Sequence, residues 1–154
     1  MPVVYYIVAL VIFIALMLWK KKWDLALLAS YMFLVFAYTV LKRNPGEELS
    51  YGMEPFWSYK AIFGNGYSPV SRETLFIQIV ANVVMFIPIG VLAGRFLRWK
   101  GIILGLGFSV MIEIIQLVSR RGLFEFDDIL HNTIGVMLGF GIVCLYRKVK
   151  GNVI

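Results

Sequence analysis

Apolar stretches long enough to cross a membrane take up most of this chain. A spanning helix needs about 20 mostly apolar residues, and five segments approach that length: Val3 to Trp19, Trp23 to Leu41, Thr74 to Leu92, Gly101 to Val118 and Asp128 to Tyr146. Hydrophobic residues make up 60% of the 154 residues, and the mean hydropathy is +0.82, whereas soluble domains are about 45–50% apolar. We therefore expect an all-α, polytopic membrane protein, with residues 1–154 forming one compact bundle of five transmembrane helices.

The basic residues predict how this bundle is oriented. One set lies directly against helix ends, with only Asp24 as an acidic neighbour: Lys20, Lys21, Lys22, Arg95, Arg98, Lys100, Arg147, Lys148 and Lys150. At the opposite ends of the helices, acidic residues offset the basic ones. Cytoplasmic loops carry the excess of Lys and Arg, so this set predicts a cytoplasmic C-terminus and an N-terminus outside the cell membrane.

The same distribution argues against some functions. The net charge of +6 comes from helix ends and not from a basic stripe interleaved with aromatic residues, so we expect no nucleic-acid partner. A single cysteine and a single histidine leave no disulfide and no thiolate or multi-histidine metal site. We therefore expect no metal and no cofactor, with one alternative left open: in an enzyme, Glu113 and Asp128 could hold a divalent cation through oxygen ligands.

The connection from Lys42 to Glu73 lies on the predicted outer side. It contains several glycines and prolines, so it is not one regular element, and it also carries six aromatic residues. Such a loop should lie on the membrane surface. Within it, Pro55 to Phe63 is predicted to form a short interfacial helix.

Polar residues follow one face of the fourth predicted span. Positions three or four apart share a helix face, which groups Ser109, Glu113, Gln116 and Arg120, with Gly101 and Gly105 on the inner part of the same ridge. A charged side chain near the bilayer centre costs about 2.5–3.5 kcal/mol on insertion scales, so such residues are usually functional. Small residues at this spacing allow another helix to approach closely.

Two further spans repeat the pattern. The fifth carries Asp128, His131 and Asn132 on the face of Gly135 and Gly139, and the third carries Thr74, Gln78 and Asn82 on one face. Pro88 should interrupt the third span, because proline removes a backbone hydrogen bond. Since polar groups on three helices lie at similar depth, we expect one shared pocket open to the outer side. Its candidate ligand-binding residues are Asn82, Glu113, Gln116, Arg120, Asp127, Asp128 and Asn132.

Each candidate also has a structural interpretation. Glu113 and Asp128 are candidates for acid–base chemistry, although Glu113 could instead bond Asn82 or Asn132 and hold the bundle together. The adjacent Asp127 and Asp128 could simply cap the fifth helix, and Asp128 is the one expected to face inward.

The remaining candidate residues also have both a functional and a structural interpretation. Arg120, on the Glu113 face, could clamp a phosphate or could neutralise acidic residues in the loop. Asn82, Gln116 and Asn132 could equally hold helices together. His131 could be a general base or a histidine at the water interface.

Three motifs in order resemble the VanZ-like family. They are Asn82-Val-Val-Met-Phe86-Ile-Pro88-Ile-Gly90, Glu113-Ile-Ile-Gln116 and Asp127-Asp128-Ile-Leu-His131-Asn132-Thr133-Ile-Gly135, and Pro55-Phe56 resembles a further family element. The resemblance covers about residues 53–146. It implies a bacterial protein that acts at the outer face of the cell membrane and is associated with resistance to glycopeptide antibiotics such as teicoplanin.

The residues leave several hypotheses open. The pocket could bind or shield a membrane lipid, a lipid-linked cell-wall precursor or the glycopeptide itself. Alternatively, the chain could be an intramembrane enzyme that modifies a lipid-linked, phosphate-bearing envelope substrate. A small transporter is less favoured because no inverted repeat is present. The glycine ridges could join helices within one chain or between chains, so a homo-oligomer also stays open.

Overall fold

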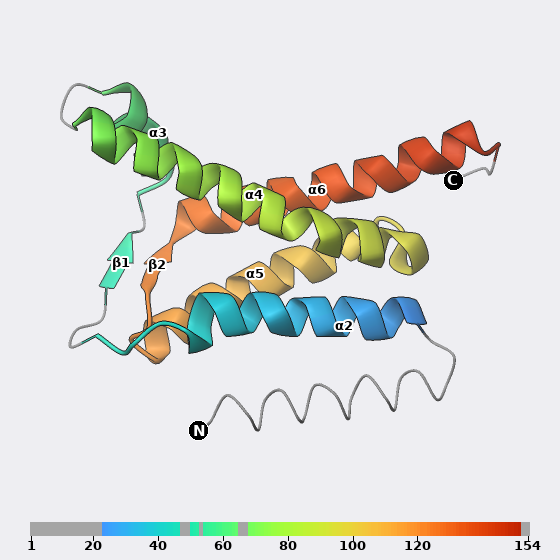
Figure 1. Cartoon of the computed structure of the whole chain (residues 1–154), viewed down its shortest axis with the longest axis horizontal. Coiled ribbons are helices and arrows are strands. Elements are labelled where there is room, and N and C mark those ends of the chain that lie inside the picture. Colours follow the sequence, from blue (N-terminus) through green and yellow to red (C-terminus); the bar gives the residue numbers. More distant parts are fainter. Residues whose placement is uncertain (1–22, 47–49, 53, 65–67, 152–154) are drawn as a thin grey trace.

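The chain folds into a bundle of long apolar helices, shown by the computed structural model in Figure 1. The structure describes residues 23–46, 50–52, 54–64 and 68–151. In chain order the elements are α2 (Trp23–Phe36), the π-helical turn η1 (Ala37–Leu41), β1 (Ser50–Gly52), α3 (Trp57–Phe63), α4 (Pro69–Leu97), α5 (Lys100–Val118), β2 (Leu123–Glu125) and α6 (Phe126–Val149). This architecture confirms the predicted all-α membrane fold.

Four segments of the described chain are long and apolar enough to cross a membrane: Trp23–Leu41, Ser71–Leu97, Lys100–Val118 and Phe126–Val149. The expected first span, Val3 to Trp19, lies outside the described residues. Many large apolar side chains on these helices are exposed, among them Leu34, Phe76, Ile103 and Ile142. Exposed apolar side chains on long helices are what contact with lipid requires, and they identify an integral membrane protein.

Helix α4 departs from prediction at Pro88. The helix continues through this proline from Pro69 to Leu97, so the predicted interruption is wrong. Proline is tolerated inside spanning helices because neighbouring helices and local adjustments satisfy the freed carbonyl. The spanning part, Ser71–Leu97, has 27 residues and is roughly 40 Å long at 1.5 Å per residue, longer than the roughly 30 Å hydrocarbon layer.

Glycines allow α4, α5 and α6 to pack closely. A Cβ added to Gly135 would lie 2.2 Å from the Val83 carbonyl oxygen, and one added to Gly139 would lie 2.1 Å from that of Ile87. On α5, a Cβ on Gly105 would lie 2.5 Å from the Val136 side chain. The predicted glycine ridges therefore join helices within this chain. Around them lies the buried apolar core, which includes Phe86, Ile89, Ala93, Phe108, Ile112 and Val136.

The connections at one end of the bundle complete the fold. β1 and β2 pair in parallel, with Tyr51 opposite Phe124, and lie beside the first turn of α6 (Figure 1). α3 packs against the start of α4 and confirms the predicted short helix, although it begins at Trp57 and not at Pro55. The polar residues of α4, α5 and α6 lie near this end of the molecule.

Candidate functional site

Four acidic residues from two helices and one strand gather near the end of the bundle that carries β1 and β2. Glu113, Glu125 and Asp127 are buried, with exposed fractions of 2%, 7% and 1% respectively, and Asp128 is half-buried. We call Glu113, Glu125, Asp127 and Asp128 the carboxyl cluster. Burying this many carboxyl groups is costly unless each finds hydrogen-bond partners or a compensating charge.

Glu113 is held by the backbone of β2. Its Oε2 accepts a hydrogen bond of 3.0 Å from the backbone N–H of Glu125. The expected partners Asn82 and Asn132 bond elsewhere: Asn82 Nδ2 donates to Asp128 Oδ1 at 2.8 Å, and Asn132 Nδ2 donates to Ser109 Oγ at 2.9 Å. Glu113 therefore fixes the strand that precedes α6, while Asn82 ties α4 to Asp128 in the first turn of α6.

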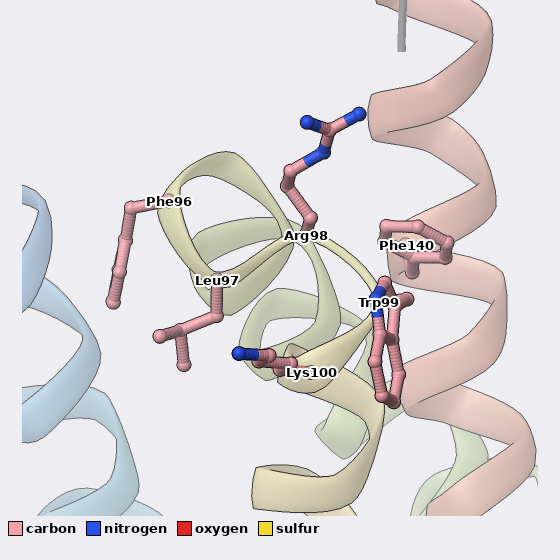
Figure 2. A pocket seen from close by; sticks show the side chains of 6 residues that line it. All are labelled: Phe96, Leu97, Arg98, Trp99, Lys100 and Phe140. Carbon is pink, nitrogen blue, oxygen red and sulfur yellow. The ribbon is translucent and has the colours of Figure 1, made fainter.

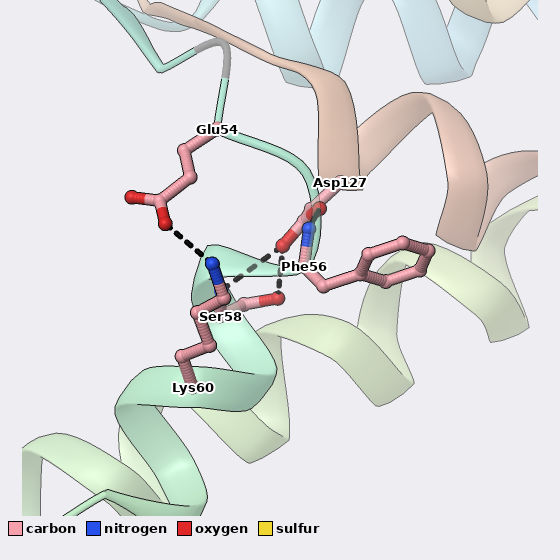
Figure 3. A network of polar contacts seen from close by, with 5 residues as sticks. All are labelled: Glu54, Phe56, Ser58, Lys60 and Asp127. Atoms are coloured by element: carbon pink, nitrogen blue, oxygen red, sulfur yellow. Dashed lines mark hydrogen bonds and ion pairs between the residues drawn. The ribbon is translucent and has the colours of Figure 1, made fainter.

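Asp127 holds α3 in place. Its Oδ1 accepts from the backbone N–H of Phe56 at 2.6 Å, and its Oδ2 accepts from the backbone N–H of Ser58 at 3.0 Å and from Ser58 Oγ at 2.5 Å (Figure 3). Asp128 faces inward as predicted, toward Asn82 of α4, but Asp127 also faces inward and is the more buried of the two. Neither aspartate caps α6, whose N-cap residue is Glu125.

His131 lies inside the protein, so the prediction of a histidine at the water interface is wrong. Its side chain is 1% exposed. His131 Nε2 lies 2.9 Å from the Tyr59 hydroxyl, and the two ring centroids are 5.5 Å apart. Burial, followed by the charge of Asp127, raises the pKa of Tyr59, so this phenol stays neutral and available as a hydrogen-bond donor.

A small cavity separates these groups from α4. It is lined by Trp57, Ser58, Leu75, Gln78, Ile79, Glu125, Asp127, Asp128 and His131, and measures about 10 Å³. That space holds roughly one water molecule. Among the described residues, two buried atoms of its lining side chains, Trp57 Nε1 and His131 Nδ1, have no hydrogen-bond partner. The cavity thus has a mixed lining, with Leu75 and Ile79 beside these two unpartnered polar atoms, and has room for one small polar group.

Glu125 is the cluster residue that lies outside the spanning segments, and its environment disfavours the charged form. Burial, then the charge of Asp128, raises its pKa to about 7, while Arg43 and the Trp57 indole act in the opposite direction. Trp57 Nε1 lies near this carboxyl without meeting hydrogen-bond geometry. Glu125 therefore changes protonation near neutral pH, in contact with the small cavity.

An open hollow of about 610 Å³ lies at the same end and is lined by Arg43, Asn44, Gly46, Arg120, Arg121, Gly122 and Leu123. We call it the arginine hollow. A Cβ added to Gly122 would lie 2.6 Å from Arg43 Nη1 and 3.2 Å from Gln116 Cδ. Arg43 thus lies against the end of α5, where its charge lowers the pKa of Glu125. Sequence patterns gave no indication of this role for Arg43.

Arg120 does not continue the polar face of α5 as predicted. The helix ends at Val118, and Arg120 follows in a left-handed conformation with φ of 55°. The backbone N–H of Arg121 bonds the Gln116 carbonyl and that of Arg120 bonds the Leu117 carbonyl, as in a Schellman turn. Glycine usually occupies this position, and a side chain there costs about 1–2 kcal/mol. An exposed arginine therefore occupies a strained position at the hollow.

Two other polar residues are structural. Gln116 Nε2 donates to the Thr39 carbonyl at 3.0 Å, which joins α5 to η1. Arg121 Nη1 donates to the carbonyls of Leu41 and Arg43 at 3.1 and 3.2 Å, and so satisfies backbone groups after η1. Of the seven predicted site residues, Asn82, Glu113, Asp127 and Asp128 belong to one connected region, whereas Gln116, Arg120 and Asn132 lie around it.

A second large hollow lies at the opposite end, at the turn between α4 and α5. Its volume is about 500 Å³ and its lining residues are Phe96, Leu97, Arg98, Trp99, Lys100 and Phe140. In Figure 2 the charged ends of Arg98 and Lys100 point in different directions, and Trp99 lies beside Phe140. Because the two cations do not converge, this hollow has no arrangement of polar groups that would bind a ligand. Separately, no cluster of three His, Cys, Asp or Glu residues able to hold a metal occurs within the described ranges.

Comparisons with known proteins give the chain a family. The family model described as VanZ/LLP1 matches residues 3–147. Protein VanZ of Enterococcus faecium is 29% identical over 85 residues, which are 53% of this chain and 53% of that protein. The match thus spans about half the length of this curated relative. No solved structure matches the chain significantly.

Proposed function

The chain belongs to the VanZ/LLP1 family, and on that premise we propose that it lowers the susceptibility of a bacterium to teicoplanin-type antibiotics. It does so at the outer face of the cell membrane, where it binds or shields a lipid-linked cell-wall component. The family is linked to teicoplanin resistance. The observation that carries the proposal is the carboxyl cluster, which lies beside the arginine hollow at one end of the spanning helices.

A lipid-linked ligand suits this arrangement. The arginine hollow is open and about 610 Å³ in volume, enough for a polar headgroup, and exposed apolar faces of the helices lie below it for a lipid tail. The cavity inside the carboxyl cluster, at about 10 Å³, admits only one small group of such a ligand. Binding therefore takes place at the hollow, and Arg43, whose charge acts on Glu125, connects the hollow to the cluster.

The orientation is part of the proposal. Arg95, Arg98, Lys100, Arg147 and Lys148 lie at the helix ends opposite the arginine hollow, and the positive-inside rule assigns those ends to the cytoplasm. A fluorescent protein fused to the C-terminus should fold and fluoresce, whereas a periplasmic or extracellular reporter there should be inactive. The reverse result would place the hollow on the wrong side.

Teicoplanin susceptibility tests the function. Expression of the wild-type chain in a susceptible Gram-positive host should raise the minimal inhibitory concentration of teicoplanin several-fold. Glu113→Gln and Asp128→Asn, expressed at wild-type levels, should lose most of this effect. Glu73→Gln changes the same group at an exposed position of α4 and should behave like wild type. Full tolerance in both cluster variants would refute the role of the cluster.

A second function is favoured by the small cavity. Its room for about one water, next to Asp128, Glu125 and the unpartnered His131 Nδ1, suits a water held for acid–base chemistry. The chain would then be an enzyme that modifies a lipid-linked envelope substrate. Lipid analysis of cells with and without the protein separates the two functions: an altered envelope lipid or precursor requires catalysis, and an unchanged lipid profile alongside full tolerance requires binding.

A further inference from the structure

Helix α3 has an exposed aromatic face, formed by Phe56 and Phe63. These side chains are 53% and 82% exposed respectively. Phe56, Lys60 and Phe63 follow one another at intervals of four and three residues, which places them on the same side of the helix. The opposite side of α3 is buried through Ser58 and Ala61. Large exposed apolar side chains that lie together on one face mark a contact with a membrane or with another protein.

Two contacts fix the height of α3 relative to the spanning helices. The backbone N–H of Phe56 donates to Asp127 Oδ1 at 2.6 Å, and Asp127 is the second residue of the span that begins at Phe126. α3 also packs against α4 and lies beside the start of that helix (Figure 1), whose spanning part begins at Ser71. Because both spans begin here, α3 lies at the height where these helices enter the membrane.

The surface on either side of α3 also carries exposed aromatic residues. Phe126, in the first turn of α6, is 43% exposed, and Phe76, near the start of the spanning part of α4, is 59% exposed. Each helix that holds α3 in place therefore presents a phenylalanine close to the point where its span begins. Since spanning helices meet lipid, the aromatic face of α3 extends a surface that is already in contact with the membrane.

We propose that α3 is a membrane-surface anchor, whose aromatic face lies between the lipid headgroups and the acyl chains of the leaflet at this end of the bundle. Amphipathic helices at this height lie in the plane of the membrane, with the apolar face buried about 5–10 Å into the boundary. The partner is a lipid surface, because the contacts with α4 and α6 hold the face at that boundary. This role goes beyond the proposed function and does not depend on its ligand.

The charge of α3 indicates what drives the contact. Lys60 is the only charged residue in Trp57–Phe63, and its Nζ lies 2.5 Å from Glu54 Oε1. The lysine charge is therefore balanced by a neighbour within the protein. Insertion of the aromatic face should depend on its apolar area and not on attraction to anionic lipids.

Spin labelling of the full chain in lipid vesicles tests the anchor. Cys144, the single cysteine, is replaced by serine, and a nitroxide is attached at Phe63→Cys or at Lys60→Cys. Both positions are exposed, so the labels should leave the thermal midpoint of the protein unchanged. Asn44→Cys, exposed beyond the end of η1, gives the reference in water, and Leu138→Cys, exposed in the middle of α6, gives the reference in the membrane interior.

The measurement compares collisions of each nitroxide with oxygen and with a water-soluble nickel chelate, because their ratio rises with depth in the membrane. At both α3 positions the ratio should be several-fold above that at Asn44 and below that at Leu138. It should be the same in vesicles of phosphatidylcholine alone and of phosphatidylcholine mixed with phosphatidylglycerol.

Three results would overturn the anchor. Ratios equal to that at Asn44 would place the aromatic face of α3 in water. Poor access of both oxygen and the chelate would show that protein covers the face. A ratio that rises only in vesicles with phosphatidylglycerol would show that charge, and not the aromatic face, draws α3 to the membrane.

Discussion

Asp127 joins the short helix α3 to the first turn of α6 through three hydrogen bonds. Its replacement by alanine leaves the N–H groups of Phe56 and Ser58 without their acceptor, next to a buried site. We expect Asp127→Ala to lower the free energy of unfolding by about 2–4 kcal/mol, since each unsatisfied buried polar group costs about 1–3 kcal/mol. Unfolding in mixed micelles with increasing anionic detergent would measure the change.

The Glu54–Lys60 ion pair gives a control in the same region. The two charged groups lie 2.5 Å apart, but their side chains are 66% and 65% exposed respectively (Figure 3). An exposed pair contributes about 0–1 kcal/mol, so Glu54→Ala should change the free energy of unfolding by less than about 1 kcal/mol. Equal effects of the two substitutions would mean that Asp127 does not hold α3.

Glu125 makes the stability of the protein dependent on pH. Burial raises its pKa from 4.5 to about 7, so between these values the folded state holds a proton that the unfolded state has lost. The free energy of unfolding contributed by Glu125 is therefore fully present below about pH 4.5 and declines as the pH rises through 7.

Thermal unfolding between pH 4.5 and 8 would measure this decline, and Glu125→Gln should make the dependence on pH shallower. Glutamine keeps the backbone N–H that bonds Glu113, so the two proteins differ in the titrating group. An identical pH dependence in both proteins would show that another group is responsible.

The sequence patterns predicted well which side chains face the interior, but they predicted poorly which residues those side chains contact. The helical period placed Ser109, Glu113 and Gln116 on one buried face of α5, because that period is a local property. The partners of Asp127 are 71 and 69 residues away in the sequence, and no local pattern relates them. Arg43 was missed for the same reason: its place beside Gly122 depends on the packing of η1 against α5.

At the scale of elements, glycines determine how closely α4 and α6 approach. An added Cβ at Gly139 would lie 2.1 Å from the Ile87 carbonyl oxygen and 2.8 Å from Val91 N, which are backbone atoms that cannot move aside. We expect Gly139→Ala to separate the helices, with a cost of about 1–3 kcal/mol or more, as for other overpacked interiors. The thermal midpoint in micelles would measure the loss.

Gly141 is the matched control on the same helix, because a Cβ there would meet nothing within 4 Å. Gly141→Ala should leave the thermal midpoint unchanged or raise it slightly, since alanine favours helix. If Gly139→Ala were as stable as Gly141→Ala, the close packing of α4 and α6 would not contribute to stability.

Element boundaries were predicted least well where tertiary contacts set them. The second span agrees with prediction at Trp23 and Leu41, but α4 extends beyond the predicted Thr74 to Leu92 at both ends. The parallel pairing of β1 with β2 joins segments far apart in the chain, and the turn after α5 forms without the glycine that normally marks it. Neither feature has a local sequence pattern of its own.

For the whole molecule, the structure separates what holds the bundle together from what is open to a ligand. The glycine contacts and the apolar core occupy the middle of the helices. The carboxyl cluster and the arginine hollow lie together at the end that carries β1 and β2. The packing contacts and the open hollow are therefore in different parts of the molecule, so substitutions at one need not disturb the other.

The most direct test of the account is the identity of the lipids that remain bound to the protein. The wild-type chain is extracted with its native membrane in polymer-bounded discs, and the retained lipids are identified by mass spectrometry. We predict enrichment of polyprenyl phosphate-linked lipids over the bulk membrane, lost in Asp128→Asn and retained in the control Glu73→Gln, which changes an exposed position of α4. A lipid composition that is the same in all three proteins would contradict the proposal that this site binds a lipid-linked envelope component.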